Sequence, residues 1–364
     1  MSVAAAPDSA RASPWGGRGL LVAYAGAILY ASLNPFHGWR LPEAILLFSW
    51  PRYWSGFDLA LNVLAYVPLG ALLAGHYART VSDAGSSTRI ALRALAMGTL
   101  WSVAMELLQT LLPQRVSSPA DVAANAGGVL GGALMVLSGS GRWLQARMIR
   151  ARNRWLVPAR RRDLGLLLCV AWLFAQLNPL VPLFDAGEVV PRQWAHAALD
   201  ASDPVLLLPV SLGILLNACA FALFLSLVLR PGRRLVAGVA GMIALGFVLK
   251  AVMAALMLRT PQFAAWLSPA AVTGVAAGLG VFVAIRRLTL RWRALAAALS
   301  LFAGGLLARL ADAPGALDTA IKLLHWPYGH VATFAGLTHW VYEAWPLAAF
   351  CFAAGIFLAA RPVE

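Results

Sequence analysis

The chain has 364 residues, of which 60% are hydrophobic and 12% charged, and its formal net charge is +14. A soluble domain carries about 25% charged residues, so this composition excludes a water-soluble globular protein. Apolar runs longer than about 18 residues recur instead, which predicts an all-α, polytopic helical membrane protein. The positive charge does not indicate nucleic-acid binding, because the basic residues lie between the apolar runs, where retention on the cytoplasmic side explains them.

Ten apolar runs are candidate membrane spans. Their approximate ranges are 17–33, 57–75, 91–112, 119–138, 164–177, 204–229, 236–258, 268–285, 292–310 and 341–360. The spans group into four parts of the chain: a four-helix unit at 1–140, a basic linker at 141–163, a second four-helix unit at 164–288 and a C-terminal hairpin at 289–364.

The basic residues set the orientation of these spans. With both termini in the cytoplasm, the inner segments hold 21 of the 29 basic residues, the outer segments hold seven, and Lys250 lies within a span. Eight arginines fall between 142 and 162, and we expect this linker to face anionic lipid headgroups. The sequence therefore predicts a multi-pass protein with cytoplasmic N- and C-termini.

Polar side chains gather at the outer ends of the first four spans. Ionisable groups are costly in a membrane and therefore indicate a functional site. Asp58 and Asn62 are four residues apart at the start of span two, so they share one helix face. The end of span three and the start of span four reach the same membrane layer. The candidate ligand-binding residues are Asp58, Asn62, Glu106, Gln109, Arg115, Asp121 and Asn125. Small residues that permit close helix packing follow: Gly127, Gly128, Gly131 and Gly132.

The second group of spans resembles a degenerate copy of the first. Ser32–Pro35 (SLNP) recurs as Gln176–Pro179 (QLNP), and both follow a short apolar run. Each copy has four spans, so the second starts on the same side of the membrane and the repeat is parallel. The copy lacks the acids of the first: Ala271 stands at the position of Asp121, and Lys250 falls near that of Glu106.

The C-terminal hairpin has an aromatic outer segment that contains three of the six histidines. This segment is typical of an interfacial aromatic belt, and the alternative interpretation is a lid over the outer site that uses His325, His330, His339 and Glu343. The histidine spacing matches no metal motif, and the three cysteines lack metal-ligand spacing. We therefore expect neither a metal nor a cofactor.

The motifs of the first half closely resemble those of the VanZ-like family of bacterial membrane proteins. In order they are Asp58–Asn62, Tyr66–Gly70, Glu106–Gln109, Arg115 and Asp121–Gly132. The resemblance covers about residues 20–138, with the degenerate second copy at about 164–288. It implies a protein of the bacterial inner membrane that takes part in cell-envelope function and teicoplanin-type antibiotic resistance. The family implies no established reaction.

Three functions remain open from the sequence. The first is an outward-facing site that binds a polar headgroup, such as a cell-wall or lipid-linked precursor or a glycopeptide. The second is an intramembrane enzyme that uses Glu106 and Asp121 as general acid and base on a lipid-linked or glycan substrate. The third is a transporter of lipids or precursors. The oligomeric state stays open, and membrane lipids are the partners that every reading shares.

Overall fold

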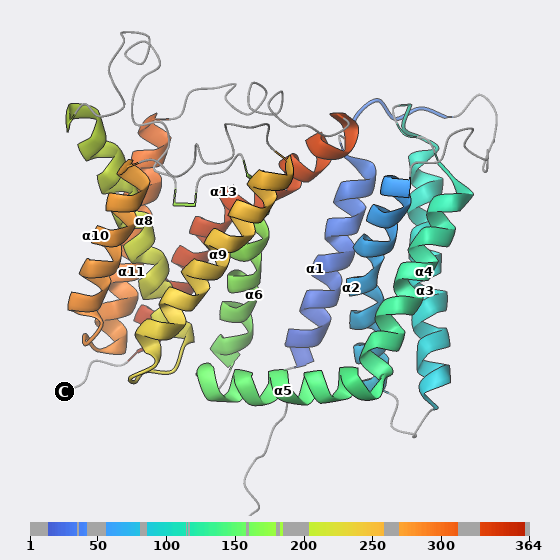
Figure 1. The fold of residues 1–364 in the computed structure, drawn as a ribbon, viewed down its shortest axis with the longest axis horizontal. Coiled ribbons are helices and arrows are strands. Elements are labelled where there is room, and N and C mark those ends of the chain that lie inside the picture. Colours follow the sequence, from blue (N-terminus) through green and yellow to red (C-terminus); the bar gives the residue numbers. More distant parts are fainter. Residues whose placement is uncertain are drawn as a thin grey trace, which may run out of the picture. The chain divides into compact units, whose positions relative to one another are not determined.

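The computed structural model describes residues 14–34, 36–41, 56–80, 86–113, 115, 117–157, 160–179, 183–184, 204–257, 269–311 and 328–360. Over these residues the chain forms eleven α-helices, and the only β-structure is a single bridge between Leu156 and Leu229 (Figure 1). Seven helices are long and apolar enough to cross a membrane, and three further apolar helices are shorter. These ten helices coincide with the ten predicted spans, which confirms the polytopic all-α fold.

The chain divides into two compact units, Met1–Arg152 and Asn153–Glu364. The helices that begin in the first unit are α1 (Pro14–Leu33), α2 (Gly56–Thr80), α3 (Ser87–Gln109), α4 (Pro119–Leu137) and α5 (Gly139–Trp155). Within this unit α2 packs along α4, and α3 packs against both. The core contains Tyr66, Leu69 and Val129.

Two of the four glycines in α4 let α2 approach closely. A Cβ atom at Gly128 or Gly132 would collide with the backbone carbonyl oxygens of Val63 or Val67 on α2. The intervening Val129 is fully buried. Gly127 and Gly131 instead face open space. Only Gly128 and Gly132 therefore have the close-packing role that was expected of all four glycines.

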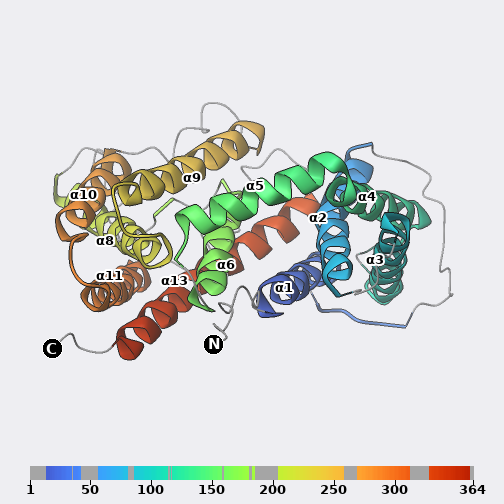
Figure 2. The same cartoon turned by 90° about the horizontal axis from the view of Figure 1, so that it is seen from below.

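α5 runs across the direction of α4 at one end of the first unit (Figure 1). Figure 2, viewed from that end, shows α5 along its length. A single residue, Ser138, separates the two helices, and its hydroxyl accepts a hydrogen bond from the backbone N–H of Gly141 at 2.9 Å. A helix therefore forms the first part of the predicted basic linker.

The second unit is organised around α8 (Pro204–Val228). An aromatic cluster links this helix to its neighbours, because Phe221 stacks on Trp172 with ring centroids 4.0 Å apart and also contacts Trp345. The remaining helices of this unit are α6 (Arg160–Ala175), α9 (Leu235–Met257), α10 (Pro269–Ile285), α11 (Leu290–Ala311) and α13 (Tyr328–Ala359).

Candidate functional site

Glu106 joins the end of α3 to the start of α4. Its carboxylate Oε2 accepts a hydrogen bond of 2.9 Å from the backbone N–H of Ser118, and both residues are buried. Ser118 is the N-cap of α4, and its hydroxyl accepts from the backbone N–H of Ala120 at 3.2 Å. The N–H groups at a helix start lack partners within the helix, and Glu106 and Ser118 provide acceptors for two N–H groups at this buried helix start.

A second buried hydrogen bond joins α3 and α4 one helix turn further in. Asn125 Nδ2 donates to the Ser102 hydroxyl at 2.9 Å. Asn125 Oδ1 is buried and has no hydrogen-bond partner among the residues that the structure describes. The sequence analysis missed Ser102, although a signal was present: Ser102 lies four residues before Glu106, on the same face of α3.

Asn62 and Asp121 form an outer pair between α2 and α4. Asn62 Nδ2 donates to Asp121 Oδ1 at 2.7 Å, and both side chains are only part-buried. Asp121 lies in the first turn of α4, where the partial positive charge of a helix start stabilises a carboxylate. It also interacts electrostatically with the buried Glu106. The site thus has an inner carboxylate that a backbone N–H holds and an outer carboxylate at a partly accessible position.

Gln109 and Arg115 bind the C-terminal end of α1. Gln109 Nε2 donates to the carbonyl oxygen of Ser32 at 3.0 Å. One guanidinium nitrogen of Arg115 donates to the carbonyl oxygens of Ala31 and Asn34, at 3.2 and 2.9 Å. The last carbonyl groups of a helix lack partners within it, so these side chains close α1 at the SLNP motif. The sequence did not reveal this contact, because backbone carbonyls leave no trace in residue types.

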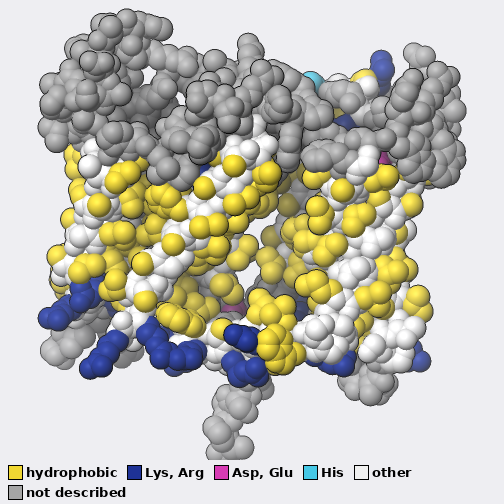
Figure 3. Space-filling model, in the orientation of Figure 1, with side chains coloured by type: hydrophobic (Ala, Val, Ile, Leu, Met, Phe, Trp, Pro, Cys, Tyr) yellow, Lys and Arg dark blue, Asp and Glu magenta, His cyan; other side chains and the backbone are white. Residues whose placement is uncertain are grey.

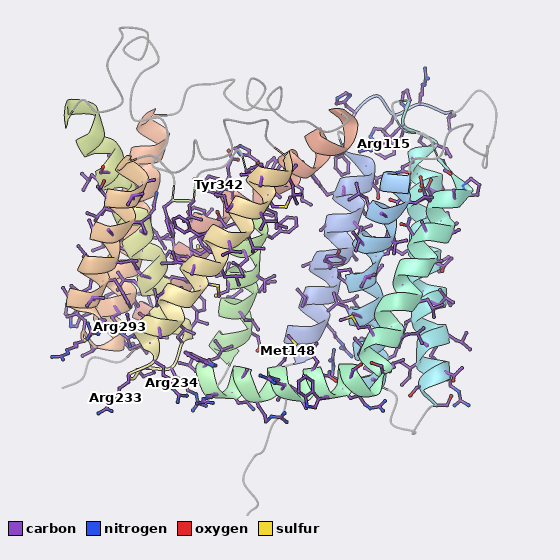
Figure 4. All side chains as sticks on the ribbon, in the orientation of Figure 1. Arg115, Met148, Arg233, Arg234, Arg293 and Tyr342 are labelled. Atoms are coloured by element: carbon purple, nitrogen blue, oxygen red, sulfur yellow. The ribbon has the colours of Figure 1, made fainter. Side chains whose placement is uncertain are left out.

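Arg115 stands at the end of the first unit that lies opposite Met148 of α5 (Figure 4). Burial lowers the pKa of the Arg115 guanidinium, but an arginine keeps its charge in proteins. Arg115 and the carboxylates of Glu106 and Asp121 are therefore the charged candidate residues described in this layer. The side chain of Asp58, on the first turn of α2, lies outside the described residues.

The predicted lid residues belong to the second unit. His339 and Glu343 lie one turn apart on α13, and His339 Nε2 is 2.9 Å from Glu343 Oε1. They are therefore part of a helix that begins at Tyr328, earlier than the predicted span at 341. His325 and the side chain of His330 lie outside the described residues. In the described part of the chain, no three His, Cys, Asp or Glu side chains are grouped to hold a metal ion.

The second unit closes its first helix in a related way. Lys250 of α9 is fully buried, and its Nζ donates to the carbonyl oxygen of Asn178 at 3.0 Å, just beyond the end of α6. Asn178 belongs to the QLNP motif, the counterpart of SLNP. Asn217 lies beside Gly304 of α11, whereas Asn62 in the first unit reaches α4. The parallel repeat itself stays a prediction.

Taken together, these helices and polar layers define a polytopic helical membrane protein with a polar site at one end of its first unit. Residues 13–140 match the family model described as VanZ/LLP1, so the VanZ-like resemblance predicted from the sequence is confirmed for this part of the chain. The match ends at the start of α5. Comparison with curated proteins and with solved structures found no match to the chain.

Proposed function

We propose that the VanZ-like unit binds the polar headgroup of a cell-wall precursor, a lipid-linked precursor or a glycopeptide. The observation that carries the proposal is the Asn62–Asp121 pair, which is part-buried at the end of an otherwise apolar helix bundle. Polar groups at such a position are costly, so their presence supports a functional site. Oxygen acceptors of this kind suit ligands rich in hydroxyl, amide N–H or ammonium donors, which sugars and peptides provide.

The orientation of the site follows from the arginines. α5 contains five arginines and no acid, and basic segments of this kind stay in the cytoplasm. Arg115 and α5 stand at opposite ends of the first unit (Figure 4), which supports a polar site that faces outward from the bacterial inner membrane. Cell-wall precursors and glycopeptides are both encountered on that side, and bound ligand there would reduce susceptibility to teicoplanin.

The remaining site residues position this pair in the proposal. Glu106 fixes the start of α4, next to Asp121. Arg115 and Gln109 hold the end of α1 beside the same layer. Truncating any of them disturbs the bundle as well as the site, so a test of binding has to act on Asp121.

The test is Asp121→Asn, with Asp163→Asn as its matched control. Both acids lie in the first turn of an apolar helix, so each variant loses a similar helix-terminus stabilisation of about 0.3–1 kcal/mol. A hydrogen bond to a charged group contributes about 1.5–3 kcal/mol, so Asp121→Asn should weaken binding by roughly 10- to 100-fold. Thermal-shift titrations with teicoplanin and with a lipid-linked cell-wall precursor measure this, alongside teicoplanin susceptibility of cells expressing each variant.

Unchanged binding of both probes by Asp121→Asn, at wild-type expression, would remove this site from the proposal. Equal losses in the two variants would point to a general effect of helix destabilisation. The proposal expects a loss in Asp121→Asn alone.

One observation favours an enzyme as the second candidate function. Glu106 is buried against a backbone N–H, whereas Asp121 is part-buried against an amide. Two carboxylates in different environments can act as a general acid and a general base. Incubation of the purified protein with lipid-linked precursors, followed by mass spectrometry, tests this function: a product that Glu106→Gln abolishes would support catalysis, and an unchanged substrate would leave binding alone.

A further inference from the structure

α5 is amphipathic, and its apolar face is uncovered. Leu144, Met148, Ala151 and Trp155 follow a spacing of four, three and four residues, which places them along one side of a helix. Leu144 is 42% exposed, Met148 63% and Trp155 36%. α5 makes no extended packing contact with another helix in the described part of the chain. Contact of this stripe with water would be unfavourable, since removing apolar surface from water is favourable by a free energy of roughly 25 cal/mol per Å².

The adjoining side of α5 is cationic. Arg147, Arg150 and Arg154 are three and four residues apart and therefore form one row next to the apolar stripe. Arg147 stacks over the ring of Trp143, with its guanidinium carbon 5.3 Å from the ring centroid. The helix carries five arginines in all and no acidic residue. Figure 3 shows basic and apolar side chains next to one another at the level of α5.

Both ends of α5 are fixed by hydrogen bonds. At its start, the Ser138 hydroxyl accepts from Gly141, and the Arg142 side chain donates to the carbonyl oxygen of Leu137, the last residue of α4. At its end, the backbone N–H of Arg230 donates to the Trp155 carbonyl at 2.8 Å, and the Arg230 side chain donates to the Leu156 carbonyl at 2.8 Å. The next membrane helix, α6, begins at Arg160. α5 therefore connects two apolar helices that are candidate membrane helices.

We infer that α5 lies in the plane of the membrane interface and binds the headgroups of anionic phospholipids. Leu144, Met148 and Trp155 insert among the upper acyl chains, and the arginine row contacts the phosphate groups. An apolar stripe beside basic residues is the arrangement by which helices bind anionic membrane surfaces. The absence of acidic side chains on α5 matches the negative charge of this partner. This surface is separate from the polar site of the proposed function.

Two labelled positions test the depth of α5 in the membrane. Met148→Cys lies on the apolar stripe, and Asn153→Cys lies five residues on, roughly 140° around the helix. Cys351 is exposed and is replaced by serine for this test, while Cys169 and Cys219 are buried. The full chain, labelled with an environment-sensitive fluorophore, is placed in nanodiscs of phosphatidylcholine with or without phosphatidylglycerol, and quenching by a neutral aqueous quencher is measured.

We expect the probe at 148 to be protected from the quencher in discs that contain phosphatidylglycerol, and the probe at 153 to stay accessible. Equal quenching at both positions would overturn the inference that α5 is embedded. Protection at 148 that is the same in pure phosphatidylcholine would overturn the assignment to anionic lipid.

A second experiment compares two pairs of exposed arginines in the full chain. Arg150→Gln with Arg154→Gln removes part of the cationic row, whereas Arg233→Gln with Arg234→Gln removes the same charge from the turn after α8. Each basic residue near an anionic surface contributes to the free energy of lipid binding. Losing two should therefore raise the half-saturating concentration of phosphatidylglycerol on the order of 30-fold. Thermal stability in neutral detergent, titrated with phosphatidylglycerol, gives this concentration. Equal shifts in both double variants would show a general charge effect and refute a site on α5.

Discussion

Glu106 illustrates how a single residue can carry a structural role and a functional role together. Its carboxylate supplies the acceptor that the Ser118 N–H requires at the buried start of α4. A buried donor that loses its acceptor costs about 1–3 kcal/mol, a large share of the stability of a typical domain. The same hydrogen bond sets the position of Asp121, three residues beyond Ser118.

Glu106→Ala should therefore lower the stability of the full chain by about 1–3 kcal/mol. Glu106→Gln keeps an oxygen acceptor at the same position and should recover most of this loss. Thermal unfolding in detergent measures the difference between the two variants. Equal stability of Glu106→Ala and the wild type would show that the Ser118 N–H has another acceptor.

At this scale the sequence predicted which polar residues form the layer, but not their partners. Asn62, Glu106, Asp121 and Asn125 are where the motifs placed them, near the ends of α2, α3 and α4. The partner of Asn125 is Ser102, and the partners of Gln109 and Arg115 are carbonyl groups of α1. The hydrogen bonds from Gln109 and Arg115 join residues 77 to 84 positions apart, so they depend on how the helices pack, which no local pattern encodes.

Among the elements, α2 and α4 form the closest helix pair of the first unit. Their contact depends on glycines on one side of α4, where carbonyl oxygens of α2 fill the space of a side chain. α2 continues through Pro68 within this contact, and the Tyr24 hydroxyl donates to the Ala65 carbonyl at 2.8 Å.

Gly128→Ala should destabilise the first unit, because its Cβ atom meets the backbone of Val63, which cannot move aside. Overpacking of this kind costs typically about 1–3 kcal/mol. Gly127→Ala is the matched control, since nothing lies within 4 Å of the Cβ position there. Thermal unfolding of the two variants in detergent measures the contrast, and equal stabilities would show that α2 and α4 adjust their separation freely.

The helices themselves were the most predictable part of the fold. Each predicted span matches a helix because an apolar run of membrane length has few alternatives to a helix. α5 was predicted only as a linker, since its sequence lacks a long apolar run. The early start of α13, at Tyr328, was missed because aromatic and histidine residues there resemble an interfacial loop.

For the whole molecule, the arginine distribution predicts a topology that reporter fusions can measure. Alkaline phosphatase fused after Pro113, beyond the third span, should be exported and active. The same enzyme fused after Trp155, beyond the fourth span and the arginines of α5, should remain in the cytoplasm and be inactive, because those arginines favour the cytoplasmic side. The reverse activities would invert the orientation and place the polar site on the cytoplasmic side.

The two units share one packing device, although the second lacks the acids. Gly278 of α10 lies against Leu215 and Ala218 of α8, as Gly128 of α4 lies against Val63 and Tyr66 of α2. Between these helices the hydroxyls of Ser211 and Thr273 pair at 3.3 Å, and neither helix carries an acid, so this interface does not reproduce the Asn62–Asp121 pair. The asymmetry agrees with a proposed function that uses the first unit alone.

Because only Ser138 separates α4 from α5, the length of α4 sets the distance between α5 and Asp121. Asp121 lies 16 residues from Leu137, which corresponds to about 24 Å along a helix, while the hydrocarbon core of a bilayer is about 30 Å thick. With α5 in the interface on one side of the membrane, as inferred, the depth of Asp121 below the opposite membrane surface depends on the thickness of the bilayer. Longer acyl chains would submerge this carboxylate and shorter ones would bring it to the surface, so lipid chain length becomes a control on ligand access.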